Sequence, residues 1–119
     1  MNSKVFWLTL ALLFLVERKS MELKAGVVLS LSPEMAKALH AIEREHLRVV
    51  GRHAIITSGR DGTHRPDSLH YSGNAVDIRS RDLSVEKKYL LASALKTALG
   101  IRFDVIVEHD HIHIEYDPK

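Results

Sequence analysis

The sequence contains no cysteine. This absence excludes disulfides and thiolate metal sites, so a bound metal ion would have to be held by histidine or by carboxylates. Histidine is abundant instead, with eight in 119 residues, and three of them fall within five positions at His109, His111 and His113. The composition therefore favours nitrogen and oxygen ligands for any metal site.

The sequence also lacks a basic block. The formal net charge is +2 and the isoelectric point is near 9.0, but basic and acidic residues are mixed along the chain. A nucleic-acid interface usually shows a basic stripe, often with interleaved aromatic residues, and aromatics make up only 6% of this chain. We therefore expect no nucleic-acid partner. The small basic excess weakly favours an anionic partner such as a cell wall.

Internal repeats, low-complexity tracts and linkers are absent as well. A chain of 119 residues that is 45% hydrophobic is long enough for one compact core and too short for two. We place a single domain at residues 21–119 and leave residues 1–20 out of the fold prediction.

The one long apolar run covers residues 5–16 (VFWLTLALLFLV). It has the length of a signal peptide and falls short of the roughly 20 residues that a spanning helix needs. The following ERKSMEL contains no small-x-small cleavage pattern. An uncleaved anchor that associates with a membrane, a cleaved signal and a true start at Met21 all stay open.

Local signals predict two helices in the remaining chain. Ser32 can cap a helix that begins at Pro33 and runs to about residue 48, with apolar residues at helical spacing. Ser84 can cap a second helix over about 85–99, which Gly100 ends.

Short apolar and β-branched segments predict four strands. They cover residues 53–57, 74–78, 103–107 and 112–116, and the last two are close enough to form a hairpin. Polar turn formers over residues 59–66 indicate a loop that is free to face a ligand. This order of elements predicts an α+β domain, a small antiparallel sheet with two helices packed on it.

Two separate segments carry metal-binding chemistry. His70 and Asp77 stand on either side of Gly73, where a turn can bring both onto one ion. In residues 111–115 (HIHIE), the period of a strand places both histidines and Glu115 on one face and the isoleucines on the other. Each segment alone is also compatible with ordinary solvated side chains. Together they provide two imidazoles and a carboxylate, the three-ligand pattern of a catalytic zinc site.

The joint pattern S-x-H-x-x-G-x-A-x-D followed by H-x-H resembles the family of zinc D-Ala-D-Ala carboxypeptidases and L-alanyl-D-glutamate endopeptidases. That family includes phage endolysins and shares its zinc site with hedgehog-type folds. The resemblance covers about residues 30–117. It implies a zinc peptidase that cuts the peptide stems of bacterial peptidoglycan, with His70, Asp77 and His113 as the ligands of Zn²⁺.

The same resemblance implies roles around the metal. His111 would lie beside the ion and hydrogen-bond the oxyanion or the water. Asp110 is the preferred general base, and Glu108 is the alternative. Arg60 and Ser68 would contact the substrate.

Four further histidines are not expected to bind the metal. His64 matches no ligand position of the family, and His40, His46 and His53 are expected at the surface or the edge of the core.

The competing function is a non-catalytic module that uses zinc to bind the cell wall or a protein. We expect a monomer in the periplasm or cell envelope, anchored to the membrane or not, or alternatively in the cytoplasm until phage lysis.

Overall fold

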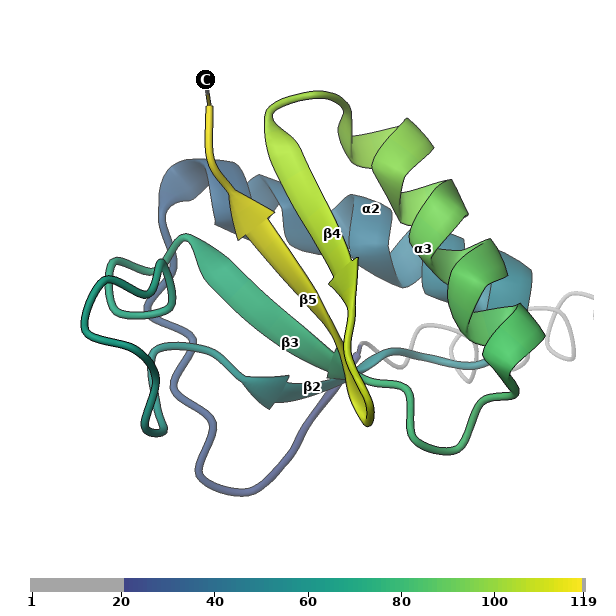
Figure 1. Cartoon of the computed structure of the whole chain (residues 1–119), viewed down its shortest axis with the longest axis horizontal. Helices are drawn as coiled ribbons and strands as arrows, with labels where there is room; N and C mark the ends of the chain where they lie inside the picture. Colours follow the sequence, from purple (N-terminus) through teal and green to yellow (C-terminus); the bar gives the residue numbers. More distant parts are fainter. Residues whose placement is uncertain (1–20, 119) are drawn as a thin grey trace, which may run out of the picture.

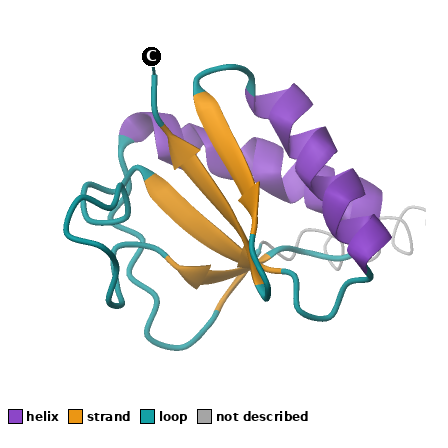
Figure 2. Cartoon of the chain, in the orientation of Figure 1, coloured by secondary structure: helices purple, strands orange, loops and turns teal. Residues whose placement is uncertain are grey.

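The computed structural model of the chain describes residues 21–118. These residues form a five-stranded sheet and two helices (Figure 1). The elements along the chain are β1 (Glu22–Leu23), α2 (Pro33–Val50), β2 (Ile55–Ser58), β3 (Ala75–Arg79), α3 (Val85–Leu99), β4 (Phe103–Val107) and β5 (His111–Tyr116). The predicted α+β class is confirmed (Figure 2).

The sheet has the strand order β1-β2-β3-β5-β4. β1 pairs with β2 in parallel, and all other neighbours are antiparallel. β4 and β5 form the predicted hairpin, yet β5 also pairs along its length with β3. This insertion of β5 beside β3 brings two segments that are distant in sequence into direct register.

Both helices begin as their sequences predict. The hydroxyl of Ser32 accepts a hydrogen bond from the backbone N–H of Met35 at 3.2 Å, and the hydroxyl of Ser84 accepts one from Lys87 at 3.1 Å. Each bond satisfies an otherwise unpaired amide of a first helical turn. α2 ends at Gly51, whose φ of 87° is in the left-handed region.

The alternation in the two central strands separates a core face from a site face. One face is fully buried against the helices and contributes Val76, Ile78, Ile112 and Ile114 to the core. The helices cover it with buried residues, namely Met35, Ala38, Ile42, Leu91, Ala92 and Leu95. The other face of the same strands carries the polar residues, so the core holds the sheet while the opposite side remains available for chemistry.

Several predicted bounds shift by one or two residues, and the differences with a clear physical cause concern β1 and β2. β1 was not predicted because a two-residue edge strand has no alternating pattern to detect. β2 begins at Ile55 rather than at His53, since the preceding residues bond to a helix side chain. Glu43 of α2 accepts hydrogen bonds from the His53 imidazole at 3.0 Å and from the Ala54 amide at 2.9 Å.

Among residues 21–118, no helix is long and apolar enough to cross a membrane. The apolar run at residues 5–16, on which the prediction of membrane association depends, lies outside the described residues.

Candidate metal centre

The pairing of the two central strands positions two residues of the site. Asp77 on β3 lies directly opposite His113 on β5. The His113 Nδ1 atom is 2.9 Å from Asp77 Oδ1, although 36 residues separate the two along the chain. Both side chains point away from the helix-covered core, because their strand neighbours Val76, Ile78, Ile112 and Ile114 occupy it.

A loop delivers the third group, His70. Its ring is almost fully buried, and its Nδ1–H donates to the carbonyl of Gly59 at 2.7 Å. That bond orients the ring and directs Nε2 toward the other two groups, where it can donate to Asp77 when it carries a proton or offer its lone pair to a metal ion. The return of the chain from His70 to β3 passes Gly73, whose φ is 76° and where a Cβ would come within 2.5 Å of the Ser30 carbonyl oxygen. Only glycine fits this turn without displacement.

The three facing atoms form a small triangle. His70 Nε2 lies 3.2 Å from both His113 Nδ1 and Asp77 Oδ1, and the third side is the 2.9 Å contact between His113 and Asp77. Ligands held at about 2.0–2.1 Å around a tetrahedral zinc ion lie about 3.3 Å from one another. The triangle therefore fits one such ion and leaves a fourth position for a further ligand. The three residues can hold a metal ion.

The electrostatics of the triangle suit a cation. Burial favours a neutral Asp77, but hydrogen bonds from His113 and His70 outweigh it and hold the pKa of this carboxyl well below its usual range. Burial lowers the pKa of His113, but the hydrogen bond to Asp77 and the charges of Asp77 and Glu115 more than compensate and raise it. Asp77 therefore stays ionised, and the site favours positive charge beside it.

Two further side chains support the ligands. The outer nitrogen of His113, Nε2, donates to Glu115 Oε1 at 3.2 Å, which orients the ring as carboxylates commonly orient metal-binding histidines. The His64 ring stacks on His70 with centroids 4.0 Å apart and planes inclined by 7°. Strand alternation placed Glu115 on the correct face but gave it no role. No local sequence signal could have revealed the stacking of His64.

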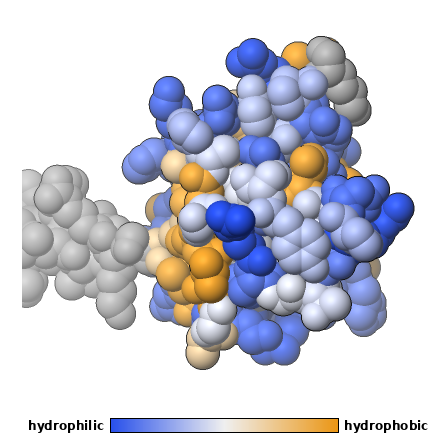
Figure 3. All heavy atoms as spheres, turned by 90° about the vertical axis from the view of Figure 1, so that its left-hand side faces the viewer, coloured by the Kyte–Doolittle hydropathy of each residue, from blue (hydrophilic) through white to orange (hydrophobic). Residues whose placement is uncertain are grey.

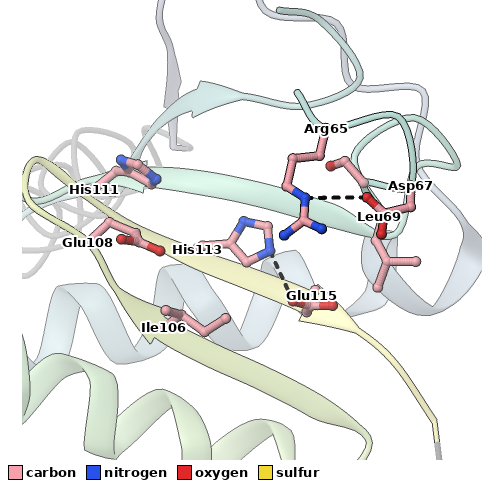
Figure 4. Close-up of a pocket in the computed structure, with 9 residues that line it drawn as sticks. Arg65, Asp67, Leu69, Ile106, Glu108, His111, His113 and Glu115 are labelled. Atoms are coloured by element: carbon pink, nitrogen blue, oxygen red, sulfur yellow. Dashed lines mark hydrogen bonds and ion pairs between the residues drawn. The ribbon is translucent and has the colours of Figure 1, made fainter. Parts of the chain in front are cut away.

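A cleft of about 350 Å³ opens beside the triangle. One wall comes from the loop before His70 and the other from β4 and β5 (Figure 4). Glu108, His111 and His113 line it, and Ile106 contributes an apolar patch. The end of the molecule that carries these loops is largely hydrophilic (Figure 3). The predicted position of the histidines at a cleft is thus observed.

The two candidate bases occupy different environments. The Asp110 carboxylate accepts a hydrogen bond from His111 Nδ1 at 2.6 Å, and this bond lowers the pKa of Asp110. His111 Nε2 then faces Asp77, 3.9 Å from its Oδ2. The Glu108 side chain lines the cleft and forms no hydrogen bond or ion pair within residues 21–118, whereas its backbone N–H donates to the His111 carbonyl at 2.9 Å. The structure therefore brings His111 itself next to the metal-binding group, and Asp110 behind it.

Of the two predicted substrate contacts, only Ser68 lines the cleft. Its hydroxyl accepts a hydrogen bond from the backbone N–H of His70 at 3.2 Å. Arg60 is exposed, and its amide is bonded to the Val28 carbonyl at 2.8 Å, but it does not line this cleft. Arg65 does, 3.5 Å from Asp67. No local sequence signal singles out Arg65, because the path of the loop decides which arginine lines the cleft.

Comparison with known protein families matches residues 32–116 to the Hedgehog amino-terminal signalling domain. The match begins at the cap of α2 and ends at the last residue of β5, so it includes all three residues of the triangle. It covers well over half of the chain, and its fold is that of a zinc-peptidase-like domain. The chain belongs to the family of the hedgehog amino-terminal signalling domain.

Proposed function

We propose that the protein is a zinc-dependent peptidase that hydrolyses peptide bonds of bacterial peptidoglycan. The observation that carries the proposal is the triangle of His70 Nε2, Asp77 Oδ1 and His113 Nδ1 at the wall of a cleft that also holds titratable groups. The likeness of the motifs to the D-Ala-D-Ala carboxypeptidases and L-alanyl-D-glutamate endopeptidases supports the choice of reaction.

Three protein ligands with an open fourth position are the usual arrangement of a catalytic zinc site, whereas structural sites use four protein ligands. Zinc, when bound, lowers the pKa of water to about 7 and polarises a carbonyl oxygen. The chain's own contribution is to hold the ligands rigidly. Gly59 fixes the ring of His70, and Glu115 fixes that of His113.

Proton transfer falls to the pair formed by Asp110 and His111. Asp110 accepts the Nδ1–H of His111, so the Nε2 lone pair is directed toward the centre, where it can take a proton from the attacking water and return it to the leaving amine. The protonated ring would then stabilise the developing oxyanion. Glu108, the unpaired carboxylate of the cleft, is the competing base.

Charge in the cleft favours a substrate with several ionisable groups. Glu108 and Glu115 can pair with an amine of the substrate, and Arg65 with a carboxylate. A peptidoglycan stem carries both kinds of group. Such a substrate implies an extracellular or periplasmic location. The match to the hedgehog amino-terminal domain, a secreted type of module, supports this location.

The family match favours a second candidate function, a non-catalytic module that uses the metal centre for binding. The matching family is a signalling domain, in which the metal centre would support binding rather than turnover. The carboxylates near His113 favour catalysis, because a binding module has no use for a proton acceptor at the metal.

The decisive experiment is digestion of purified peptidoglycan by the zinc-loaded protein, with and without a chelator, followed by mass spectrometry of the released fragments. We expect one class of peptide bond to be cut, and cutting to stop with the chelator or with His113→Ala. Saturable binding to peptidoglycan without cleavage would favour the second candidate.

Variants of the proton acceptors refine the assignment. His111→Gln and Asp110→Asn should lower kcat while zinc content stays at one ion per chain. Glu108→Gln should have a smaller effect. If Glu108→Gln alone abolished turnover, Glu108 and not His111 would be the base.

A further inference from the structure

A second cleft lies on the same face of the sheet, beside Asp77 and His111. Its volume is about 310 Å³, and its walls include Lys24, Arg79 and Arg81 as well as Asp77, Asp110 and His111. His111 lines both clefts, so the metal-binding group lies where the two meet. We call this second space the cationic cleft, after Lys24, Arg79 and Arg81.

The sheet positions Arg79 next to the centre. It follows Asp77 by two residues on β3 and therefore shares its face. Across the strands it lies in register with His111. A group bound to Arg79 is consequently a neighbour of the proposed proton acceptor.

Backbone bonds hold the other two cations at the same edge. The amide of Arg81 donates to the Asp110 carbonyl at 3.1 Å, which ties the chain after β3 to the β4–β5 hairpin. The amide of Lys24 donates to the Ile56 carbonyl at 2.9 Å, at the end of β1. Hydrogen bonds thus anchor the segments of chain that carry Lys24 and Arg81 at the rim of this cleft.

Ion pairs do not neutralise the positive charge of this cleft. Within residues 21–118, none of the three cations forms an ion pair. The charge of Arg79 helps to lower the pKa of Asp82, but the carboxylate of Asp82 pairs with Arg52 at 2.6 Å. Of the two carboxylates in the cleft, Asp110 is bonded to His111 and Asp77 belongs to the metal-binding triangle. In the first cleft, on the other side of the metal-binding triangle, negative charge predominates. Glu108 and Glu115 line that cleft, and its Arg65 lies beside Asp67.

We propose that the cationic cleft binds a carboxylate of the peptide substrate next to the bond that is cut, with Arg79 as its principal contact. This inference rests on the proposed peptidase function and adds to it a polarity for the substrate, with its carboxylate toward Arg79 and any amine toward Glu108 and Glu115. A guanidinium pairs with a carboxylate through two parallel hydrogen bonds, which makes the interaction geometrically selective. The enzyme thereby prefers free carboxylates over amides at this position.

Binding is tested with two small probes on the full, zinc-loaded chain. N-acetyl-D-alanine carries the carboxylate, and N-acetyl-D-alaninamide differs only in lacking the charge. In a titration followed by NMR of ¹⁵N-labelled protein, N-acetyl-D-alanine should shift the amides of Arg79 and Arg81. The amide probe should bind about tenfold or more weakly, as expected for losing charge-assisted hydrogen bonds.

Substitutions identify the contact. Arg79→Gln should weaken N-acetyl-D-alanine by about tenfold or more, and Arg79→Lys should recover part of the loss because it keeps the charge but not the fork. Lys37→Gln is the matched control, since Lys37 is exposed on α2 and lines neither cleft. It should bind N-acetyl-D-alanine as the parent does.

Kinetics provide a second readout where hydrolysis is observed. With a peptidoglycan stem peptide, Arg79→Gln should raise KM with little change in kcat, and the effect should vanish with the corresponding peptide amide. Zinc content should stay the same in all variants.

The outcomes separate the two proposals. If the parent cuts no peptidoglycan but binds N-acetyl-D-alanine in the predicted way, the peptidase proposal fails and the carboxylate site stands. If both probes bind equally, or Arg79→Gln binds the acid unchanged, the carboxylate site is overturned whether or not hydrolysis occurs.

Discussion

At the scale of single residues, one backbone carbonyl decides how the metal-binding triangle is presented. Gly59 accepts the Nδ1–H of His70 and so directs Nε2 toward Asp77 and His113. The segment that contains Val28 packs directly over Gly59, where a Cβ would lie 2.1 Å from the Val28 carbonyl oxygen. Gly59 therefore contributes to the geometry of the metal centre without binding the ion. It has no side chain that would displace the Val28 segment, and its carbonyl orients His70.

Gly59→Ala should weaken zinc binding. The methyl group would push Gly59 and the Val28 segment apart and move the carbonyl that holds His70. Loss of such an outer partner typically costs about 10–100-fold in metal affinity. Competition with a chelating dye measures the affinity. Thr63→Ala, an exposed site in the same loop, is the control, and equal affinities of the two variants would contradict the argument.

A buried histidine on α2 gives a pH-dependent contribution to stability. Burial lowers the pKa of His46, and the Arg52 carbonyl, which accepts its Nδ1–H at 2.6 Å, only partly offsets this. Below the ordinary histidine pKa of about 6.5 the unfolded chain binds a proton more readily than the folded one. The free energy of unfolding should therefore fall as the pH drops from 6.5 through the lower, folded pKa.

His46→Gln should remove this part of the acid sensitivity. Urea denaturation of the chelator-treated protein at pH 7.5 and at pH 5 should show a smaller difference for the variant than for the parent. His40→Gln, at an exposed site on the same helix, should behave as the parent does. The same pH difference in the parent and the His46 variant would rule out the effect.

At the scale of elements, β5 has two functions on two faces. Ile112 and Ile114 are fully buried in the core, and His111 and His113 face the clefts. Because the side chains of a strand alternate, stability and metal binding can be altered independently along it.

Ile114→Ala and His113→Ala should show this separation. Removing a buried isoleucine side chain costs about 2–5 kcal/mol of unfolding free energy, with or without metal. His113→Ala should abolish zinc binding, and in the presence of a chelator it should cost less unfolding free energy than Ile114→Ala does, because His113 lies outside the core cluster. Chemical denaturation with and without chelator measures both. A loss of zinc affinity in folded Ile114→Ala as large as that in His113→Ala would refute the independence of the faces.

At the scale of the whole molecule, the metal centre joins three parts of the chain. His70 comes from a loop, Asp77 from β3 and His113 from β5. An ion bound to all three stabilises only the folded state, since the unfolded chain does not hold these groups together.

Zinc should therefore raise the melting temperature, and a chelator should reverse the rise. At free zinc a hundredfold above Kd, the stabilisation is about 2.7 kcal/mol. In His70→Ala and Asp77→Ala the zinc-dependent increment should disappear. Differential scanning calorimetry measures it, and an increment that survived in both variants would show that zinc binds elsewhere.

Local sequence patterns determined most of the fold. Ser32-Pro33 and Ser84 mark the helix starts because their hydroxyls satisfy amides of the first turn within three residues. The alternation in residues 111–115 assigned both isoleucines to the core because a strand has a period of two. These interactions are short in sequence, so the sequence by itself was sufficient.

Only the tertiary structure decided how the site is completed. The pairing of β5 with β3 sets the distance between Asp77 and His113, and the path of the loop brings Arg65 rather than Arg60 to the cleft. The attachment of Asp110 to His111 and the convergence of Lys24 with Arg79 are likewise absent from any local pattern. Their physical cause is the packing of segments tens of residues apart, which fixes side-chain directions that no spacing along the chain encodes.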